Sequence, residues 1–522
     1  MKVNPLNMPE IITLVGRSLP LWKYSERLGF YDFNPKTLIS CALVNKTWYH
    51  SLIPVIWCVY NGSVMRSIPR DVIAKNSRHF RILFYDRSLS SPFESRQLKE
   101  LIIPWCDDKL VPLVEANAET LQTLAWKGST SPSSSRETTL PMLDYDLFMR
   151  MAPTLQELQL SHWSLSGQDF VKFLAACRRL RSLCFAAIDW INPVPWASSN
   201  STPMSSPLCS PLSSPSSPMS FSLSATDSFY RHQEGQGLTH LRLDISVPKA
   251  GAFADLVRSC PDLESFSLYS ESSDDARTLI PILREYCPNL TSIEYVTRFS
   301  SALNGYDFMT DSEYSDLVLS ARGLQSLKVD VPWLNDAMTK ALILQSSTLT
   351  SLELRFFKRR DDPMTDAENI STVLKYCTRL RKLSLFFSPH ALGREETLRL
   401  FEESWGCMEL EVLELTDITI TTAAVNTPTT EQNTVIHDAH NGGPSIQPYQ
   451  RRIAPAPRPI PIPIESSRRS CGIGCGHNNG NGSLAKQKLF EQVRKLPKLA
   501  KLSLNHVTYS VDGNFGCTGG AS

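Results

Sequence analysis

The sequence has no apolar run approaching the 18 or so residues of a membrane-spanning helix. Two prolines and several polar residues occupy its first ten positions, where a secretory signal would have an unbroken apolar stretch. The 53 lysine and arginine residues are balanced by 52 acidic residues, so no excess of one charge favours nucleic acid or an anionic membrane as the main partner. These absences predict a soluble intracellular protein, cytoplasmic, nuclear or both, with no nucleic-acid or membrane partner.

The motifs of common catalytic and cofactor sites are also absent. There is no G-x-x-x-x-G-K-[ST] phosphate loop, no G-x-S-x-G nucleophile turn and no H-E-x-x-H zinc helix, and the 10 histidines are scattered. Cys471, Cys475 and His477 offer three soft ligands, but a closed zinc site needs a fourth. We therefore predict a non-catalytic protein with no metal and no cofactor, although a hydrolase whose triad assembles only in space would show no motif.

What the sequence contains instead is a repeated phrase of nine residues. Its clearest copy begins at Cys377 and has leucines at Leu380, Leu383 and Leu385. In a short strand the last two leucines share one face, and the first turns inward just before it. One such strand cannot shield that face from water, whereas parallel copies stacked side by side form a continuous core.

Thirteen copies of the phrase occur along the chain, many of them 25 to 34 residues apart, which is the period of a strand plus a helix. Before several copies, apolar residues recur at i, i+3, i+4 and i+7, as in residues 170–177. The pattern predicts an α/β leucine-rich-repeat solenoid of parallel strands and helices. The first apolar residues of the copies are Phe80, Leu98, Leu121, Leu155, Leu180, Leu238, Leu263, Leu290, Leu324, Leu349, Leu380, Leu410 and Leu499.

Five of the 13 cysteines stand at the first position of the phrase, where other copies have alanine or serine. This position therefore requires a small side chain at the end of a helix. We predict packing, rather than redox or metal chemistry, for Cys177, Cys260, Cys287, Cys377 and Cys407.

Two segments interrupt the repeats, and we predict that both are disordered. The first, 193–232, is rich in serine and proline and has too little apolar area to fold. The second, 421–485, is rich in proline and glycine, and its closely spaced prolines favour a semi-rigid spacer. The remaining predicted divisions are a helical domain at 1–60, repeats at 75–192 and 233–420, a terminal repeat at 486–507 and a flexible tail at 508–522.

The first insert carries four Ser-Pro pairs, at Ser206, Ser210, Ser214 and Ser217. Such pairs suit proline-directed kinases, and phosphates there would add clustered negative charge. Loops of this composition are also common without any modification, so phosphorylation is one of two open interpretations.

The first sixty residues do not follow the repeat. Pro9 suits a first helical turn and Glu10 suits the positive end of a helix dipole, so we expect a helix to begin there. A second apolar pattern at mostly helical spacing extends from Leu38 to Leu52, and Pro54 is expected to end it. Residues 20–36 would connect the two helices.

These residues resemble the F-box family. That family begins with Leu-Pro and an acidic residue before an apolar helix, matched here by Met8, Pro9 and Glu10. Its later Val-(Cys/Ser)-(Lys/Arg)-x-Trp is matched by residues 44–48, and Trp57 matches a frequent downstream tryptophan. With the repeats that follow, the chain as a whole is similar to F-box/LRR proteins.

The resemblance implies a substrate receptor of an SCF-type ubiquitin ligase. The helical domain would bind the Skp-type adaptor, and through it a cullin-RING ligase, while the solenoid would hold an unknown protein substrate for ubiquitin transfer by proximity. Trp48 and Trp57 are then expected in the core of the helical domain. The residues expected to contact the adaptor are Met8, Pro9, Glu10, Ile11, Leu38, Val44 and Lys46.

In each strand the residue between the last two leucines faces away from the core, toward the concave surface that such arrays use for binding. These positions, and those that follow the phrase, mix both charge signs with aromatic residues, which suits a protein ligand. An ordinary solvated face is the alternative for any single residue. The predicted substrate-binding residues are Arg242, Tyr269, Glu294, Lys328, Glu353, Arg355 and Phe386.

A second class of function is also open. The chain would be a plain repeat scaffold, for example a regulator of a small GTPase, if residues 1–60 only cap the solenoid. Exposure discriminates between the two classes, because a cap turns a polar face outward, whereas an F-box leaves apolar side chains free for a partner.

Overall fold

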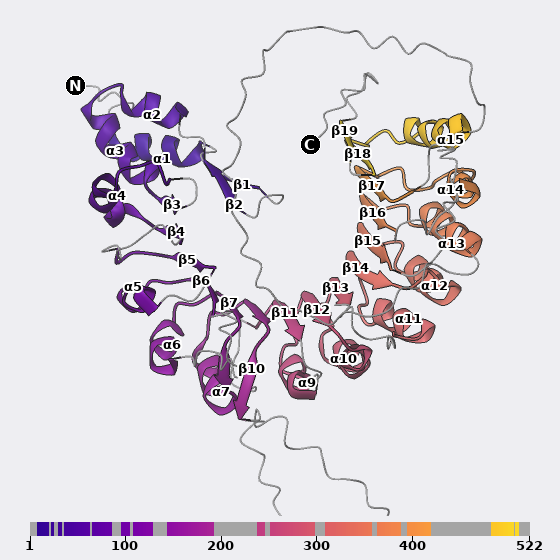
Figure 1. Cartoon of the computed structure of the whole chain (residues 1–522), viewed down its shortest axis with the longest axis horizontal. Helices are drawn as coiled ribbons and strands as arrows, with labels where there is room; N and C mark the ends of the chain where they lie inside the picture. The colour runs from indigo at the N-terminus through magenta and orange to yellow at the C-terminus, as the bar shows by residue number, and fades with distance from the viewer. Residues whose placement is uncertain are drawn as a thin grey trace, which may run out of the picture.

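Strands and helices alternate along an open arc, with the strands on its inner side and the helices on its outer side (Figure 1). This arrangement, in a computed structural model, confirms the predicted α/β leucine-rich-repeat solenoid. The four Ser-Pro pairs, and Cys471, Cys475 and His477, lie outside the described residues. The structure describes residues 8–19, 22–25, 30–33, 36–62, 65–85, 95–104, 108–128, 144–192, 237–245, 251–297, 308–357, 363–387, 394–418, 482–505 and 507–510.

One sheet of 15 strands runs along the inside of the arc. All neighbouring strands in it are parallel except the last pair, in which β19 (Val507–Ser510) runs antiparallel to β18 (Lys501–Leu504) and covers its outer edge. The other strands, in order, are β3 (Val59–Asn61), β4 (Ile82–Phe84), β5 (Glu100–Ile103), β6 (Thr123–Lys127), β7 (Glu157–Ser161), β9 (Ser182–Ala186), β11 (His240–Ile245), β12 (Ser265–Ser270), β13 (Ser292–Thr297), β14 (Ser326–Val331), β15 (Ser351–Phe356), β16 (Lys382–Phe386) and β17 (Val412–Thr416).

Helices cover the outer face of this sheet, and none of those in the described residues is long and apolar enough to cross a membrane. Two small sheets lie apart from the main one: the antiparallel pair β1 (Trp22–Ser25) and β2 (Phe30–Phe33), and the parallel pair β8 (Ser164–Ser166) and β10 (Asp189–Asn192). The outer helices are α4 (Arg70–Asn76), α5 (Val111–Ala116), α6 (Tyr145–Met151), α7 (Gly167–Ala176), α9 (Gly251–Arg258), α10 (Ser273–Tyr286), α11 (Asp311–Leu319), α12 (Asp336–Leu344), α13 (Pro363–Tyr376), α14 (Arg394–Leu400) and α15 (Gly482–Arg494), with short 3-10 turns at Ser77–His79 and Asp108–Leu110.

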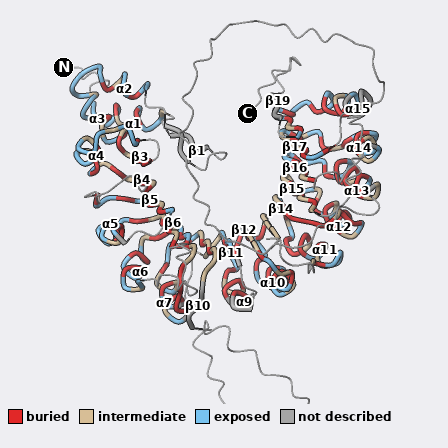
Figure 2. Tube along the Cα trace, viewed as in Figure 1, coloured by how far each residue is buried: buried red, intermediate tan, exposed pale blue. Residues whose placement is uncertain are grey.

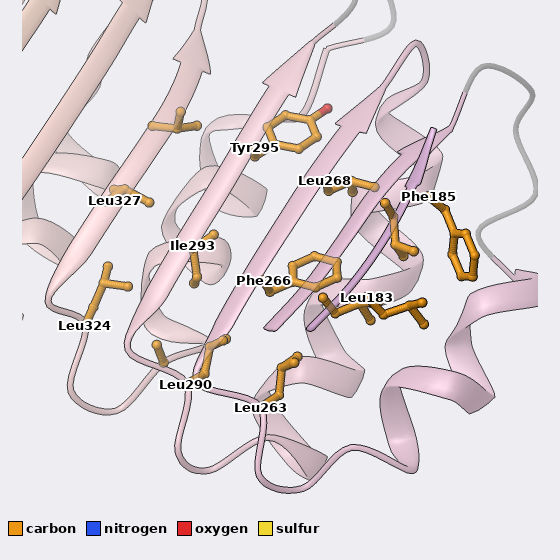
Figure 3. Packing of buried hydrophobic residues seen from close by; sticks show 14 of the residues in the cluster. Leu183, Phe185, Leu263, Phe266, Leu268, Leu290, Ile293, Tyr295, Leu324 and Leu327 are labelled. Carbon is orange, nitrogen blue, oxygen red and sulfur yellow. The ribbon is translucent and has the colours of Figure 1, made fainter. Parts of the chain in front are cut away.

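In-register pairing turns the repeated leucines into continuous rows. Leu352 on β15 is paired with Leu327 on one side and with Leu383 on the other. Side chains of these rows, such as Leu327 and Ile293, point to the same side and pack between the sheet and the helices (Figure 3). Figure 2 shows the resulting buried band along the whole arc. Each of the thirteen copies has a first apolar residue, from Phe80 to Leu499. Twelve of these residues are buried, and Leu238 is partly buried against the same core.

The five repeat cysteines are buried, as predicted. Two of their thiols reach the previous repeat: Cys287 Sγ donates to the carbonyl oxygen of Val257 (3.7 Å) and Cys377 Sγ to that of Leu342 (3.8 Å). Burial raises the pKa of Cys377 to about 12, so the group is a neutral thiol at physiological pH. The position thus joins consecutive repeats by packing and weak hydrogen bonds.

The sheet begins earlier than the phrase indicates. β3 carries no leucine, and Tyr60 occupies the inward position that leucine fills in later strands. The ring of Tyr60 stacks on Phe80 of the next repeat at a centroid distance of 5.1 Å. The solenoid core therefore starts inside the segment that was predicted as part of the helical domain.

The last repeat rejoins the solenoid after the second insert. Gln492 on α15 is buried, and its side-chain amide donates to the carbonyl oxygens of Phe401 (3.1 Å) and Glu403 (3.0 Å). The side chain of Asn505 makes two hydrogen bonds with the backbone of Ile418, accepting from its N–H (3.1 Å) and donating to its carbonyl (2.9 Å). These contacts fix the terminal repeat to residues more than eighty positions earlier in the chain.

Candidate protein-binding surfaces

Three helices before the sheet form a small core of their own. α1 (Pro9–Ser18) and α2 (Lys36–Ala42) both pack against α3 (Lys46–Ile56). Gly16 permits the close approach of α1 and α3, because a Cβ atom there would lie 2.6 Å from Cδ2 of Leu52. The buried side chains of this core are Ile12, Leu38, Ala42, Leu52 and Val55.

The helix boundaries differ from the sequence prediction. The single helix expected from Leu38 to Leu52 is two helices, because Asn45 adopts an extended conformation and caps α3: its Oδ1 accepts the N–H of Trp48 at 3.0 Å. Pro54 does not end α3, which continues to Ile56. Pro54 lacks the N–H that would donate to the carbonyl four residues earlier, so α3 continues past it with one hydrogen bond fewer. The predicted connection contains the hairpin β1–β2.

Leu38 and Trp57 are not where they were expected, and Trp48 is less buried in the helical core than expected. Leu38 has no exposed surface, so it belongs to the core and not to an adaptor-binding surface. Trp48 is only partly buried and packs against the edge of the helical core. Trp57 lies in the core of the solenoid, with its ring 6.3 Å from that of Phe80. The other residues predicted to contact an adaptor, Met8, Pro9, Glu10, Ile11, Val44 and Lys46, are all exposed.

The helices carry a concentration of exposed apolar side chains, which we call the helical patch. Eight of the 13 exposed large apolar side chains in the described residues lie on α1, α2, α3 and the short α2–α3 turn. Leu14 and Val44 are each 64% exposed. Exposed apolar side chains that gather on neighbouring helices are typical of surfaces that bind a partner. The helical patch comprises Met8, Ile11, Leu14, Val15, Ile39, Leu43, Val44 and Tyr49.

Most of the helical patch was not singled out from the sequence. Leu14 and Val15 extend the helical face that begins with Ile11, and Leu43 lies four residues after Ile39. Spacing alone does not reveal whether an apolar residue faces the core or solvent. The signal available in the sequence was an excess of apolar residues over what three short helices can bury.

The seven residues predicted on the concave surface form one connected row across six neighbouring strands, which we call the concave ladder. It begins on β11, where the guanidinium of Arg242 lies over the ring of Tyr269 on β12, 4.2 Å from its centre. The Tyr269 hydroxyl donates a 2.5 Å hydrogen bond to Oε1 of Glu294 on β13. Lys328 on β14 follows, with Nζ 2.6 Å from the same oxygen.

The second half of the concave ladder repeats these elements in reverse order. Lys328 Nζ lies 3.8 Å from Oε1 of Glu353 on β15. Arg355, on the same strand, donates to that oxygen from Nε (2.9 Å) and Nη2 (2.8 Å). Its guanidinium lies 5.4 Å from the ring centre of Phe386 on β16. The order is therefore arginine on aromatic ring, glutamate, lysine, glutamate, and arginine on aromatic ring.

Hydrogen bonding sets the charge state of the concave ladder. Burial opposes ionisation of Glu294, but the hydrogen bonds from Lys328 and Tyr269 hold its pKa below the usual value. Burial and the adjacent Glu294 raise the pKa of the Tyr269 phenol, so it stays a neutral donor. No cluster of three His, Cys, Asp or Glu arranged for a metal ion occurs among the described residues. The surface presents paired charges and two aromatic rings with an arginine over each.

The first strands of the arc carry a different concave surface. Ile82 and Phe84 on β4 and Ile102 on β5 occupy the outward positions, and each is partly exposed. This apolar stretch was not predicted from the sequence, since the outward positions predicted to bind a substrate begin at β11. The concave surface therefore changes from apolar near the helical domain to charged in the second half.

Comparison with known proteins gives one partial similarity. No family model matches the chain. Over 163 residues the chain is 30% identical to F-box/LRR-repeat protein 17 of Arabidopsis thaliana, and the aligned region covers 27% of each protein. The chain thus spans about a quarter of that relative's length. In part of its sequence, this solenoid with N-terminal helices is similar to a protein named for an F-box and leucine-rich repeats.

Proposed function

We propose that the protein is the substrate-recognition subunit of an SCF-type ubiquitin ligase. The helices α1, α2 and α3 bind a Skp-type adaptor, and the concave surface of the solenoid binds a protein substrate. The chain contributes no catalytic group; it brings the substrate to the ligase for ubiquitin transfer and degradation, and the rate gain is one of proximity.

The helical patch is the observation that carries this proposal. Helices that only close the end of a solenoid turn a polar face to solvent. Here Leu14, Leu43 and Val44 are largely exposed instead, and Pro9 and Glu10 of the F-box-like motif are exposed as well. Burial of such side chains against a partner helix is the main source of affinity in interfaces of this kind. The partial similarity to an F-box/LRR protein supports the same function.

The test is binding of the purified chain to a Skp-type adaptor, measured by pull-down and calorimetry. The double variant Leu14→Glu/Val44→Glu places two charges in the helical patch and should weaken binding by about a hundredfold or more, because a buried unpaired charge is costly. The matched control is Leu344→Glu on α12, where the leucine is 71% exposed on the far part of the solenoid. It should bind as the intact chain does.

Two results would reject the proposal. One is a failure of the intact, folded chain to bind the adaptor. The other is equal binding by the intact chain and by a folded double variant. Circular dichroism and the melting temperature establish folding in each case.

A repeat scaffold is the second candidate, and one observation favours it. Ile53 and Ile56 on α3 pack against the core of the solenoid, and Ile56 also packs against the helical core. α3 therefore covers the first repeat, as a cap would. If capping is its whole role, the intact chain binds no adaptor, and removal of α1 and α2 lowers the melting temperature of the repeats.

A further inference from the structure

We infer that the concave ladder binds an acidic segment of the substrate polypeptide, with Arg242 and Arg355 as its two anchors. This inference rests on the proposed function, since it names the chemistry of the segment that the solenoid would hold. Two observations support it: how exposed each charged side chain is, and which of these side chains form ion pairs or hydrogen bonds within the protein.

The carboxylates of the concave ladder are less exposed than its cations, and one oxygen of each is engaged. Glu294 accepts from Tyr269 and pairs with Lys328, and Glu353 pairs with Arg355. The Glu353 side chain is 17% exposed, whereas that of Arg355 is 42% exposed. One oxygen of each carboxylate is therefore paired within the protein, and the most exposed charged side chains of the concave ladder are cationic.

Arg242 is the anchor with unused hydrogen-bonding capacity. It is exposed, and its guanidinium carbon lies over the ring of Tyr269, 4.2 Å from the ring centre. Among the described residues no carboxylate forms an ion pair with it. A guanidinium whose face rests on a ring still offers its N–H donors at the edge, in a fork that matches a carboxylate.

The separation of the two arginine–aromatic pairs sets the length of peptide that the site would bind. Arg242 is on β11 and Arg355 on β15, four strand spacings apart. At about 4.8 Å per spacing the separation is about 19 Å, which an extended peptide crosses in about six residues. Lys328 lies on β14 between them, so the path has a cation at each end and one within it.

The arrangement favours a polypeptide over single-stranded nucleic acid. Bases bind such surfaces by stacking on open aromatic rings. Tyr269 and Phe386 instead have arginine over their rings, at 4.2 Å and 5.4 Å. A basic peptide is disfavoured for a different reason, because its lysines would have to displace Lys328 and Tyr269 from Glu294.

The experiment measures binding of four labelled probes to the intact chain by fluorescence anisotropy at low ionic strength. The first is a 12-residue peptide with two Glu-Glu pairs centred about six residues apart, the spacing derived above. The second and third replace its glutamates by glutamine and by lysine, and the fourth is a single-stranded DNA of about 12 nucleotides. The glutamate peptide should bind at least about tenfold more tightly than the others.

The variant Arg242→Glu/Arg355→Glu should lower the affinity for the glutamate peptide at least about tenfold, and Arg242→Gln alone, which leaves the Glu353 pair intact, should lower it about threefold or more. The control is Arg284→Glu, an exposed arginine on the outer helix α10, which should change the affinity by less than about twofold. Circular dichroism and melting temperature confirm folding.

Four outcomes would overturn the inference: no binding of the glutamate peptide at 1 mM, equal binding of the glutamine peptide, tighter binding of the lysine peptide or the DNA, or no effect of Arg242→Gln. Adaptor binding is measured on the same preparations. If the chain binds the adaptor but not the glutamate peptide, this inference is rejected and the proposed function stands. If it binds the peptide through Arg242 but no adaptor, the proposed function is rejected and the peptide site stands.

Discussion

The backbone N–H of Thr297 donates a 3.0 Å hydrogen bond to Oδ2 of Asp330, on the neighbouring strand β14. The other carboxylate oxygen, Oδ1, is buried and has no hydrogen-bond partner among the described residues. Burial raises the pKa of Asp330 to about 6, although Arg355 and the Thr297 hydrogen bond act in the opposite direction. Burial therefore favours the protonated form of this carboxyl group, at the edge of the concave ladder, over the ionised form that it adopts in water.

This carboxylate makes stability depend on pH with a defined sign. The ordinary pKa of an aspartate is about 3.9, so the folded protein holds this proton more tightly than the unfolded chain. The stabilisation is fully present below about pH 4 and is lost as the pH rises through about 6. Asp330→Asn removes the titration and keeps an acceptor for Thr297. Relative to the intact chain, its free energy of unfolding should rise by about 2 kcal/mol between pH 4 and 7.

Urea denaturation at several pH values measures this difference. The control is Glu264→Gln, which removes an exposed carboxylate before β12 and should leave the pH profile within about 0.5 kcal/mol of the intact chain. A difference between Asp330→Asn and the intact chain that stays constant with pH would show that Asp330 titrates normally.

The cap at the start of α3 gives a second prediction. Asn45→Ala removes the acceptor for the Trp48 N–H and should destabilise the helix by about 1 kcal/mol, whereas Asn45→Ser, which retains a capping oxygen, should cost much less. The readout is hydrogen exchange of the α3 amides, which should become about fivefold faster in the alanine variant. Identical exchange in the two variants would contradict the capping role.

The two tryptophans near the helical domain should differ in their contribution to stability. Trp57 is buried in the solenoid core beside Phe80, so Trp57→Ala should cost about 3 to 5 kcal/mol. Trp48 is only partly buried, so Trp48→Ala should cost about 2 kcal/mol or less. Chemical denaturation of both variants measures the order. A larger loss for Trp48 would mean that it, and not Trp57, anchors this end of the molecule.

The solenoid was predictable from the sequence because its information is periodic. Leucines at fixed spacing specify where each strand lies, which face of it points inward and which strand is its neighbour. The first apolar residues of the copies, from Phe80 to Leu499, therefore all reach the core. β3 was not predicted, because Tyr60 occupies the leucine position in a strand of only three residues. The division between α2 and α3 was not predicted, because apolar residues continue at helical spacing across it. Only the capping conformation of Asn45 separates the two helices.

The candidate surfaces were predictable in part, and for different reasons. Alternation along a strand places Glu294 and Lys328 outward by a rule that needs no structure. Their contacts depend on strand register across repeats of unequal length, so the pairing of Lys328 with both glutamates could not be derived. In the helices no such alternation exists, and burial depends on how α1 and α2 pack on α3. This is why Leu38 was expected on the surface and is in the core.

Gln492 gives the last prediction, because its buried amide connects α15 to the repeat that precedes the second insert. Gln492→Ala removes the donors to the carbonyl oxygens of Phe401 and Glu403 and leaves both carbonyls without these bonds, which should cost about 2 to 3 kcal/mol. Only the terminal repeat depends on these contacts. Hydrogen exchange should therefore rise across residues 482–505 and stay unchanged in β12 to β16.

Gln487→Ala is the matched control, since Gln487 is exposed on the same helix and donates only to Glu491 one turn later (3.0 Å). It should leave exchange in the terminal repeat nearly unchanged, because an exposed pair within one helix contributes about 0.5 kcal/mol or less. Faster exchange throughout the solenoid in Gln492→Ala would mean that the repeats unfold as one unit. Equal exchange in the two variants would mean that the terminal repeat is held by its leucines alone, and that the buried amide only satisfies carbonyls that water would otherwise reach.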